Sequence, residues 1–203
     1  MSWATMIARA AGYVVPASEW NQLIANDNYL KTAVLAQIFI SAAGMSPLAA
    51  APCAPLATTS LGTPGIRDIK TLDFDKDTAE YADSVLFAMP SDYNGGTFTF
   101  KVIWKHAATT TNFKVAWGLA AVAFADDLAL NVAYGSVVQV NDIGGTTSDY
   151  YITPESAAVT PGGTAAAGCG MLIQINRFAT DATNDTLAID AGLIGVQITY
   201  TRN

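Results

Sequence analysis

Two acidic clusters and a single histidine are the residues of this chain whose types could support chemistry. Residues 73–77 read DFDKD and place carboxylates at alternate positions, as at the start of a calcium-binding loop. Such a loop continues with Gly and closes with Glu, but Thr78 and Ser84 stand at those positions. We therefore expect solvated carboxylates at a strand end and predict no metal site there.

The second cluster, formed by Asp181, Asn184 and Asp185, is rich in oxygen atoms within one short segment. These oxygens could hold a cation if a neighbouring strand added carbonyl groups. The same residue types also form Asx turns, in which the side chain bonds its own backbone. The sequence leaves both interpretations open.

His106 is the only histidine, so any Ser-His-Asp or Cys-His mechanism would have to use it. Its neighbours Lys105, Ala107 and the threonine run at 109–111 predict an exposed turn. We therefore expect a protein that is not an enzyme. The paired carboxylates of a glycosidase would have to face each other across a cleft, which sequence spacing does not reveal.

Cys53 and Cys169 are far apart in the sequence and show no metal-ligand spacing. They predict neither a disulfide framework nor a zinc site, and they fit folding in a reducing cytoplasm. No cofactor is expected.

The composition indicates contact between subunits. The chain has 203 residues, of which 51% are hydrophobic and only 13% are charged, about half of the usual fraction of roughly 25%. Surface that is normally ionic must then be neutral or packed against neighbours.

The charge and the hydropathy pattern exclude two classes of partner. A formal net charge of −7 without a basic run argues against nucleic acid. The most apolar window, residues 33–56, is interrupted by Pro47, Pro52 and Pro55, and the first residues lack the basic and apolar order of a secretory signal. We expect no membrane association.

Residues 80–105 predict a β-hairpin. Phe98, Phe100, Val102 and Trp104 alternate with polar or smaller residues in the second arm, which places one set of side chains on a buried face. The segment 90–96, PSDYNGG, supplies residues that tolerate turn conformations.

Residues 16–38 predict a helix that follows an extended arm. Pro16 and Ser18 mark its start, and its apolar residues recur mostly at spacings of three and four. Asp27 lies on the apolar stripe, which indicates either a register device between identical helices or a helix outside any coiled coil.

The remainder predicts a linker and a β domain. Residues 41–65 are small and punctuated by Pro and Gly, and about eight alternating segments separated by turn residues follow to the end. We predict a mainly β protein, an antiparallel jelly-roll-like β-sandwich preceded by an N-terminal arm and one α-helix. The predicted units are 1–45 (arm and helix), 46–66 (linker) and 67–203 (sandwich).

Two segments resemble known virion proteins. Trp3-Ala4-Thr5, the stretch from Gly12 to Asn21 and the segment from Asn26 to Lys31 are similar to the N-terminal module of tailed-bacteriophage structural proteins. The stretch from Met89 to Gly96, Ile103-Trp104 and the segment from Asn184 to Ala188 resemble β-sandwich domains of phage virions, with Tyr93 where an aromatic residue is expected. The resemblance carries no catalytic residue.

This resemblance implies a non-enzymatic bacteriophage virion structural protein. The leading expectation is a capsid decoration or head-fibre protein that acts through contacts with its own copies, in a homotrimer, and with other virion proteins. An alternative is a tail-fibre or receptor-binding protein that recognises a host surface glycan, and a distant alternative is a sandwich-fold carbohydrate hydrolase. Whether the protein belongs to the head or the tail is left open.

The predicted contact residues form two sets. Those expected to oligomerise or attach the chain are apolar residues of the arm and helix: Trp3, Trp20, Leu23, Ile24, Leu30, Val34 and Ile38. Three tyrosines could stack on receptor sugars, although tyrosines equally often cap a sandwich edge: Tyr93, Tyr150 and Tyr151.

Overall fold

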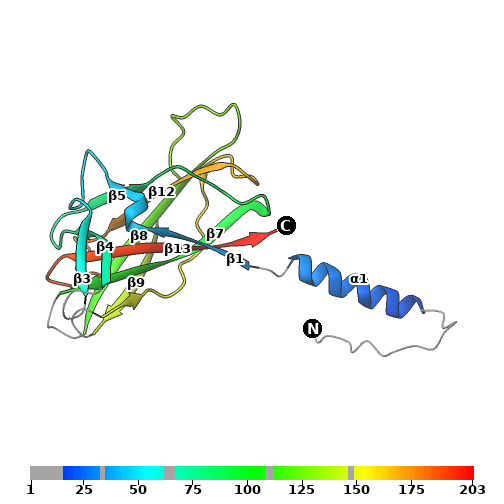
Figure 1. The fold of residues 1–203 in the computed structure, drawn as a ribbon, viewed down its shortest axis with the longest axis horizontal. Coiled ribbons are helices and arrows are strands. Elements are labelled where there is room, and N and C mark those ends of the chain that lie inside the picture. The colour runs from blue at the N-terminus through cyan, green and yellow to red at the C-terminus, as the bar shows by residue number, and fades with distance from the viewer. Residues whose placement is uncertain (1–15, 33–34, 62–66, 108–111, 146–148) are drawn as a thin grey trace.

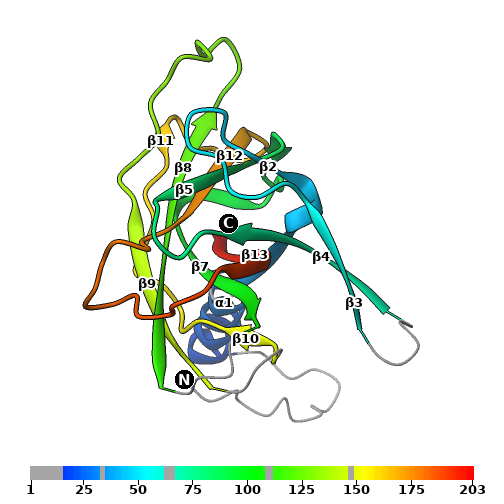
Figure 2. The ribbon, with the colours of Figure 1, turned by 90° about the vertical axis from the view of Figure 1, so that its left-hand side faces the viewer.

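The computed structural model of the chain describes residues 16–32, 35–61, 67–107, 112–145 and 149–203. A helix near the N-terminus is followed by two sheets that pack face to face (Figures 1 and 2). This arrangement confirms the predicted fold class of a mainly β, antiparallel sandwich behind one α-helix.

The first sheet is built around β13, the last strand of the chain. Its strands follow the order β10-β7-β13-β4-β3, and β1 also pairs with β13. The bounds of these strands are β1 Leu35–Ser41, β3 Ala57–Leu61, β4 Arg67–Phe74, β7 Tyr93–His106, β10 Tyr151–Ile152 and β13 Ala191–Arg202.

The second sheet follows the order β11-β8-β12-β5-β2, with β6 paired to β12 and β9 paired to β8. All pairings are antiparallel except the short one between β11 and β8. The bounds are β2 Met45–Pro47, β5 Glu80–Ser84, β6 Phe87–Ala88, β8 Phe113–Phe124, β9 Val138–Gly144, β11 Gly162–Gly163 and β12 Gly170–Arg177.

The hydrophobic core lies between the two sheets and confirms the alternation predicted for the second arm of the hairpin at residues 80–105. The hairpin itself is wrong, because β5 and β6 pair with β12 in the second sheet, whereas β7 pairs with β13 and β10 in the first. Trp104 of β7 and Trp117 of β8 are fully buried, and Phe74 meets Trp117 edge to face with ring centroids 5.3 Å apart. The other buried residues of the predicted alternating segments are Met89, Phe98, Phe100, Val102, Phe113, Val115, Leu119, Met171, Ile173, Ile175, Val196, Ile198 and Tyr200.

The helix is shorter than its sequence pattern predicts. Helix α1 spans Ala17–Thr32, and Pro16 accepts hydrogen bonds from the backbone N–H groups of Glu19 (3.0 Å) and Trp20 (3.2 Å) at its start. The prediction that Ile38 belongs to the helix is wrong. Ile38 lies in β1, opposite Ile198, because a seven-residue ladder with β13 overrides the helical spacing of the apolar residues.

The predicted linker at 46–66 is wrong as a free connection. Within its described part, β2 pairs with β5 and β3 pairs with β4, while Cys53 is buried between them. The N–H of Ala54 donates to the Asp73 carbonyl at 2.9 Å. Small residues allow this segment to lie close against strand edges, so the sandwich begins at β1 and not at residue 67.

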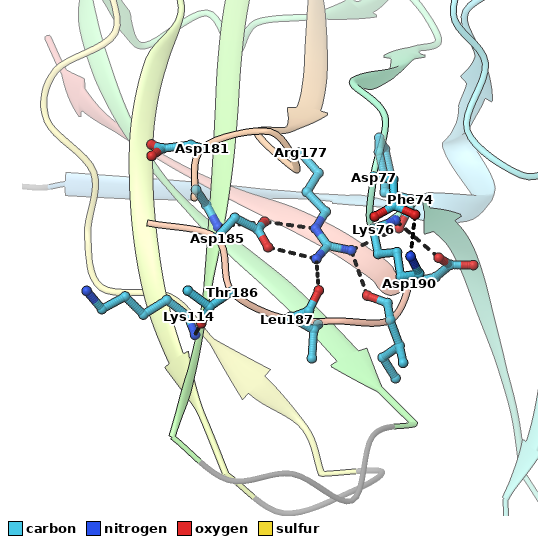
Figure 3. Close-up of polar contacts among 12 residues, drawn as sticks. Phe74, Lys76, Asp77, Lys114, Arg177, Asp181, Asp185, Thr186, Leu187 and Asp190 are labelled. Carbon is cyan, nitrogen blue, oxygen red and sulfur yellow. Dashed lines mark hydrogen bonds and ion pairs between the residues drawn. The ribbon is translucent and has the colours of Figure 1, made fainter. Parts of the chain in front are cut away.

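A buried ion pair holds one end of the sandwich together (Figure 3). Arg177, at the end of β12, is fully buried and binds Asp185 with two parallel bonds, Nε to Oδ2 at 2.8 Å and Nη2 to Oδ1 at 2.7 Å. The remaining guanidinium donors reach carbonyl oxygens of Leu187 (2.7 Å) and Ile189 (2.8 Å) and of Phe74 at the end of β4 (3.2 Å). The pair therefore joins both sheets to the loop before β13.

We predict that Arg177→Met destabilises the protein by about 3–5 kcal/mol, because it leaves a buried carboxylate without its partner. The matched control is Arg202→Met, since Arg202 pairs with Asp92 at the surface and such pairs contribute about 0–1 kcal/mol. Chemical denaturation measures both losses. Equal losses for the two variants would contradict the structural role of the Arg177 pair.

Candidate functional site

Three surfaces are candidates for a functional site, and the first is the apolar side of α1. Trp20, Leu23 and Ile24 are 55%, 40% and 55% exposed. They follow the i, i+3, i+4 spacing that brings side chains together on one side of a helix. Figure 1 shows α1 projecting away from the sandwich beyond the start of β1. The sandwich therefore leaves these side chains uncovered.

Other predicted attachment residues lie elsewhere. Ile38 lines the sandwich and not the helix. Trp3 and Val34 lie outside the described residues, as does the side chain of Leu30.

The second surface is a shallow depression of about 590 Å³ on the outer face of the first sheet. Its floor is formed by threonine and glutamine side chains of β1, β7 and β13, with Glu155 at its side. The Gln197 amide donates to Oε1 of Gln37 at 2.7 Å. Glu155 accepts a hydrogen bond from the Thr99 hydroxyl and forms an ion pair with Lys101. This surface offers fixed donors and acceptors with little net charge.

The state of Glu155 follows from these contacts. Burial acts to raise its pKa, but the hydrogen bonds from Thr99 and Lys101, together with the Lys101 charge, outweigh that effect and lower the pKa. The carboxylate is therefore ionised at neutral pH and acts as a hydrogen-bond acceptor.

The third candidate, the His106 corner, consists of His106, Trp104, Tyr151 and Phe113. The Tyr151 ring stacks on Trp104 with centroids 4.7 Å apart, and His106 lies against Phe113 at 4.5 Å. Nε2 of His106 is 3.2 Å from the Tyr151 hydroxyl. His106 is only 2% exposed, so the prediction of an exposed turn is wrong: β7 extends through His106 and buries its ring.

Titration at the His106 corner reflects burial. Burial lowers the pKa of His106, while Asp149 acts to raise it and Lys105 acts to lower it. Asp142, which accepts a 2.8 Å hydrogen bond from the Trp104 indole, has its pKa raised by burial. The imidazole is a packed aromatic ring that is neutral at physiological pH.

The three predicted receptor tyrosines are placed differently. Tyr93 is fully buried, donates its hydroxyl to the Gly96 carbonyl and meets Tyr200 edge to face. Burial raises its pKa to about 12. Its prediction as a surface contact is therefore wrong, because β7 turns this ring inward. Tyr151 is half-buried in the His106 corner, and Tyr150 is 60% exposed.

The acidic clusters serve local structure. Oδ1 of Asp75 accepts bonds from the N–H groups of Asp77 (2.7 Å) and Thr78 (2.8 Å), and these bonds lower its pKa. In the second cluster Asp181 accepts from the Asn184 amide at 2.8 Å, and Asp185 is committed to Arg177. Among the described residues, no three metal-binding side chains converge.

Sequence reasoning missed two of these features. The Arg177 and Asp185 pair was signalled by a lone arginine that ends the apolar alternation of residues 171–177. The polar depression had no such signal, because its residues come from three strands and a loop that only the fold brings together. No helix in the described part of the chain has the length and apolar character to cross a bilayer.

Comparison with known proteins finds structural neighbours of low identity and no family. No family model matches the sequence, and no curated protein matches it. One similar solved structure is the Clostridium thermocellum xylanase 10B fragment with CBM22-1 and GH10 modules bound to xylohexaose, with 14% identity and a TM-score of 0.41. That match covers 85% of this chain and 29% of the xylanase chain.

Two further structures are carbohydrate-binding modules. The CBM36-1 domain of a xylanase from the hindgut metagenome of Trinervitermes trinervoides is 11% identical with a TM-score of 0.34, covering 80% of this chain and 96% of that one. TmCBM61 in complex with β-1,4-galactotriose is 11% identical with a TM-score of 0.29, covering 85% and 91%. At these identities and TM-scores the matches carry no conclusion about this chain.

We predict that His106→Phe reduces the loss of stability on acidification. The His106 pKa is lowered from its ordinary value of 6.5, so below that value the unfolded chain binds a proton that the folded chain resists. Acid therefore destabilises the wild type through this residue, and the variant lacks the effect. Urea midpoints at about pH 7.5 and about pH 5.5 measure it. The other titrating groups are common to both proteins, so equal pH dependence would contradict the prediction.

Proposed function

We propose that this chain is a non-enzymatic structural protein of a tailed-bacteriophage virion, a capsid decoration or head-fibre protein that acts through contacts between subunits. The observation that carries the proposal is the placement of α1 outside the sandwich, with Trp20, Leu23 and Ile24 exposed. A helix of 16 residues is marginally stable alone in water and needs a packing surface. In this proposal that surface is supplied by other subunits.

The sandwich suits the same role. Its core is closed by aromatic contacts and by the Arg177 ion pair, and its one histidine is buried in the His106 corner. A rigid domain with few charges presents a stable outer surface, while the helix is the segment that contacts other subunits. The proposed partners are further copies of the chain, in a homotrimer by resemblance, and other proteins of the capsid or tail, with assembly in the virion after folding in the host cytoplasm.

The helix provides the test of this proposal. We predict that Trp20→Ser combined with Leu23→Ser and Ile24→Ser abolishes both self-association and incorporation into particles, because it removes the exposed apolar side chains. The control replaces Asn21, Gln22 and Ala25 with Ser on the same helix and leaves both properties intact. Light scattering measures association, and immunogold labelling of virions measures incorporation and separates head from tail.

Two results would contradict the proposal. The first is incorporation of the apolar triple variant at the wild-type level. The second is absence of label from purified virions assembled in cells that express the wild-type chain.

The polar depression on the first sheet favours a second candidate, a tail-fibre or receptor-binding protein for a host surface glycan. Sugars are recognised by arrays of hydroxyl, amide and carboxylate groups, and Gln37, Thr199 and Glu155 provide such an array. Tyr150 adds an exposed ring elsewhere on the surface.

Under this alternative we predict that Gln37→Ala with Thr199→Ala weakens binding to a glycan found on an array by about tenfold or more, since two hydrogen-bonding groups are lost. Gln139→Ala on β9 is the control, because it changes an exposed amide on the other sheet. Absence of binding to any glycan on the array by the wild-type chain would remove this candidate.

A further inference from the structure

The sandwich carries an apolar groove on the side where β1 faces the segment between β5 and β6. The groove has a volume of about 440 Å³ and is lined by nine residues that carry no charge: Ile38, Phe39, Ile40, Ser41, Gly44, Val85, Phe87, Ala88 and Pro90. One wall is the edge of the first sheet and the other is the edge of the second sheet, so the groove opens between the two layers.

The walls of the groove expose apolar surface. Phe39 is 54% exposed and Val85 is 59% exposed, and Leu86 beside them is 58% exposed. The Phe39 ring lies on the backbone of Gly195, where an added Cβ would come within 2.4 Å of it, so the ring is held in place at the rim. Ser41 is already engaged, because its hydroxyl accepts from the N–H of Ala43. The groove therefore offers a fixed apolar surface and no polar recognition.

Helix α1 has the matching surface. Trp20, Leu23 and Ile24 occupy i, i+3 and i+4 positions, which is the pattern of helices that bind in apolar grooves. In the single chain these residues stay exposed, since α1 leads away from the sandwich (Figure 1). The groove is lined by residues 38–41 in the second half of β1. The same chain thus carries an apolar helix surface and an apolar groove that do not contact each other within one copy.

The lack of charge in the groove favours a second copy of this chain over a charged partner. The chain carries a net charge of −7, so two copies repel each other wherever their acidic surfaces meet. The groove and the three residues Trp20, Leu23 and Ile24 carry no charge, so burying these side chains in the groove pairs no like charges. Asp27 follows on the same side of α1, so the contact requires that its carboxylate stay outside the groove and in water. An acidic or basic partner would gain nothing from this groove.

We propose that the groove between β1 and the β5 to β6 segment binds α1 of a second copy of this chain. The inference rests on the self-association in the proposed function and names the surface that receives the helix. Each copy donates one helix and accepts another, which is a heterologous contact. Such contacts close into a ring when the rotation between copies permits, and a ring of three agrees with the trimer expected from resemblance.

The test uses two full-length variants. The helix variant carries Leu23→Glu and Ile24→Glu and keeps an intact groove, and the groove variant carries Phe39→Glu and Val85→Glu and keeps an intact helix. All four side chains are at least 40% exposed, so the sandwich is expected to fold in both, which circular dichroism verifies. Controls with equal charge changes are Asn21→Glu with Gln22→Glu on the helix, and Leu130→Glu with Ile143→Glu at sites 80% and 69% exposed on the sandwich.

Sedimentation of the wild type, the controls, each variant and a 1:1 mixture gives the readout. We expect oligomers for the wild type and the controls, at least about tenfold weaker self-association for each variant, and a heterodimer in the mixture, because one intact helix then meets one intact groove. If the groove variant does not fold, Val85→Lys alone replaces it.

Three results would overturn the inference. A groove variant that associates as tightly as the wild type would show that the helices bind one another. A mixture that stays monomeric would show that the groove is not the acceptor, and a monomeric wild type would show that no such contact forms. The first two leave the virion proposal standing, because immunogold labelling and incorporation of the helix triple variant test it separately.

Discussion

The bidentate pair between Arg177 and Asp185 is the constraint on which the closed end of the sandwich depends. Removing two charges from water costs several kcal/mol per ion, and the cost is recovered only if every donor finds an acceptor. Arg177 makes six hydrogen bonds, two to Asp185 and four to carbonyl oxygens. Asp185 also accepts from the N–H of Ala116 on β8. One guanidinium thereby fixes the ends of β4 and β12 and the loop before β13.

The two outer faces of the sandwich differ in how they are covered. The loop held by Arg177 and the segment before β9 cover the second sheet: an added Cβ on Gly118 of β8 would meet Phe178 and Val137 within 3 Å. Along β8 residues of both alternating sets are buried, including Ala116 and Ala120. Among the described residues, no comparable loop covers Gln37 and Thr199 on the first sheet, and the polar depression lies there.

The sequence predicted the buried faces of single strands, which depend on the local alternation of side chains. It missed features that depend on pairing between strands distant in the sequence. Alternation placed Phe98, Phe100 and Trp104 on the buried face, because one strand side must face the core. Ile38 was assigned to a helix because its spacing fits both a helix and a strand, and only pairing with β13 decides between them.

Single residues of the candidate sites show the same limit. His106 was expected in an exposed turn from its polar neighbours, but the stacking of Tyr151, distant in sequence, buries it. Tyr93 was expected at the surface, but β7 begins at that residue and turns it toward Tyr200. The apolar residues of α1 were found from spacing because their role is local to one helix.

The direct connection of α1 to β1 has a mechanical consequence. Only residues 33 and 34 separate the helix from a strand whose seven residues all pair with β13, the central strand of its sheet. Figure 1 shows α1 continuing in roughly the direction of β1, so tension on the helix acts along the ladder. Pulling along antiparallel strands loads all their hydrogen bonds together, whereas peeling them breaks the bonds one after another. If the helix anchors the domain, a pulling force must therefore break all the hydrogen bonds between β1 and β13 at once before the strand detaches.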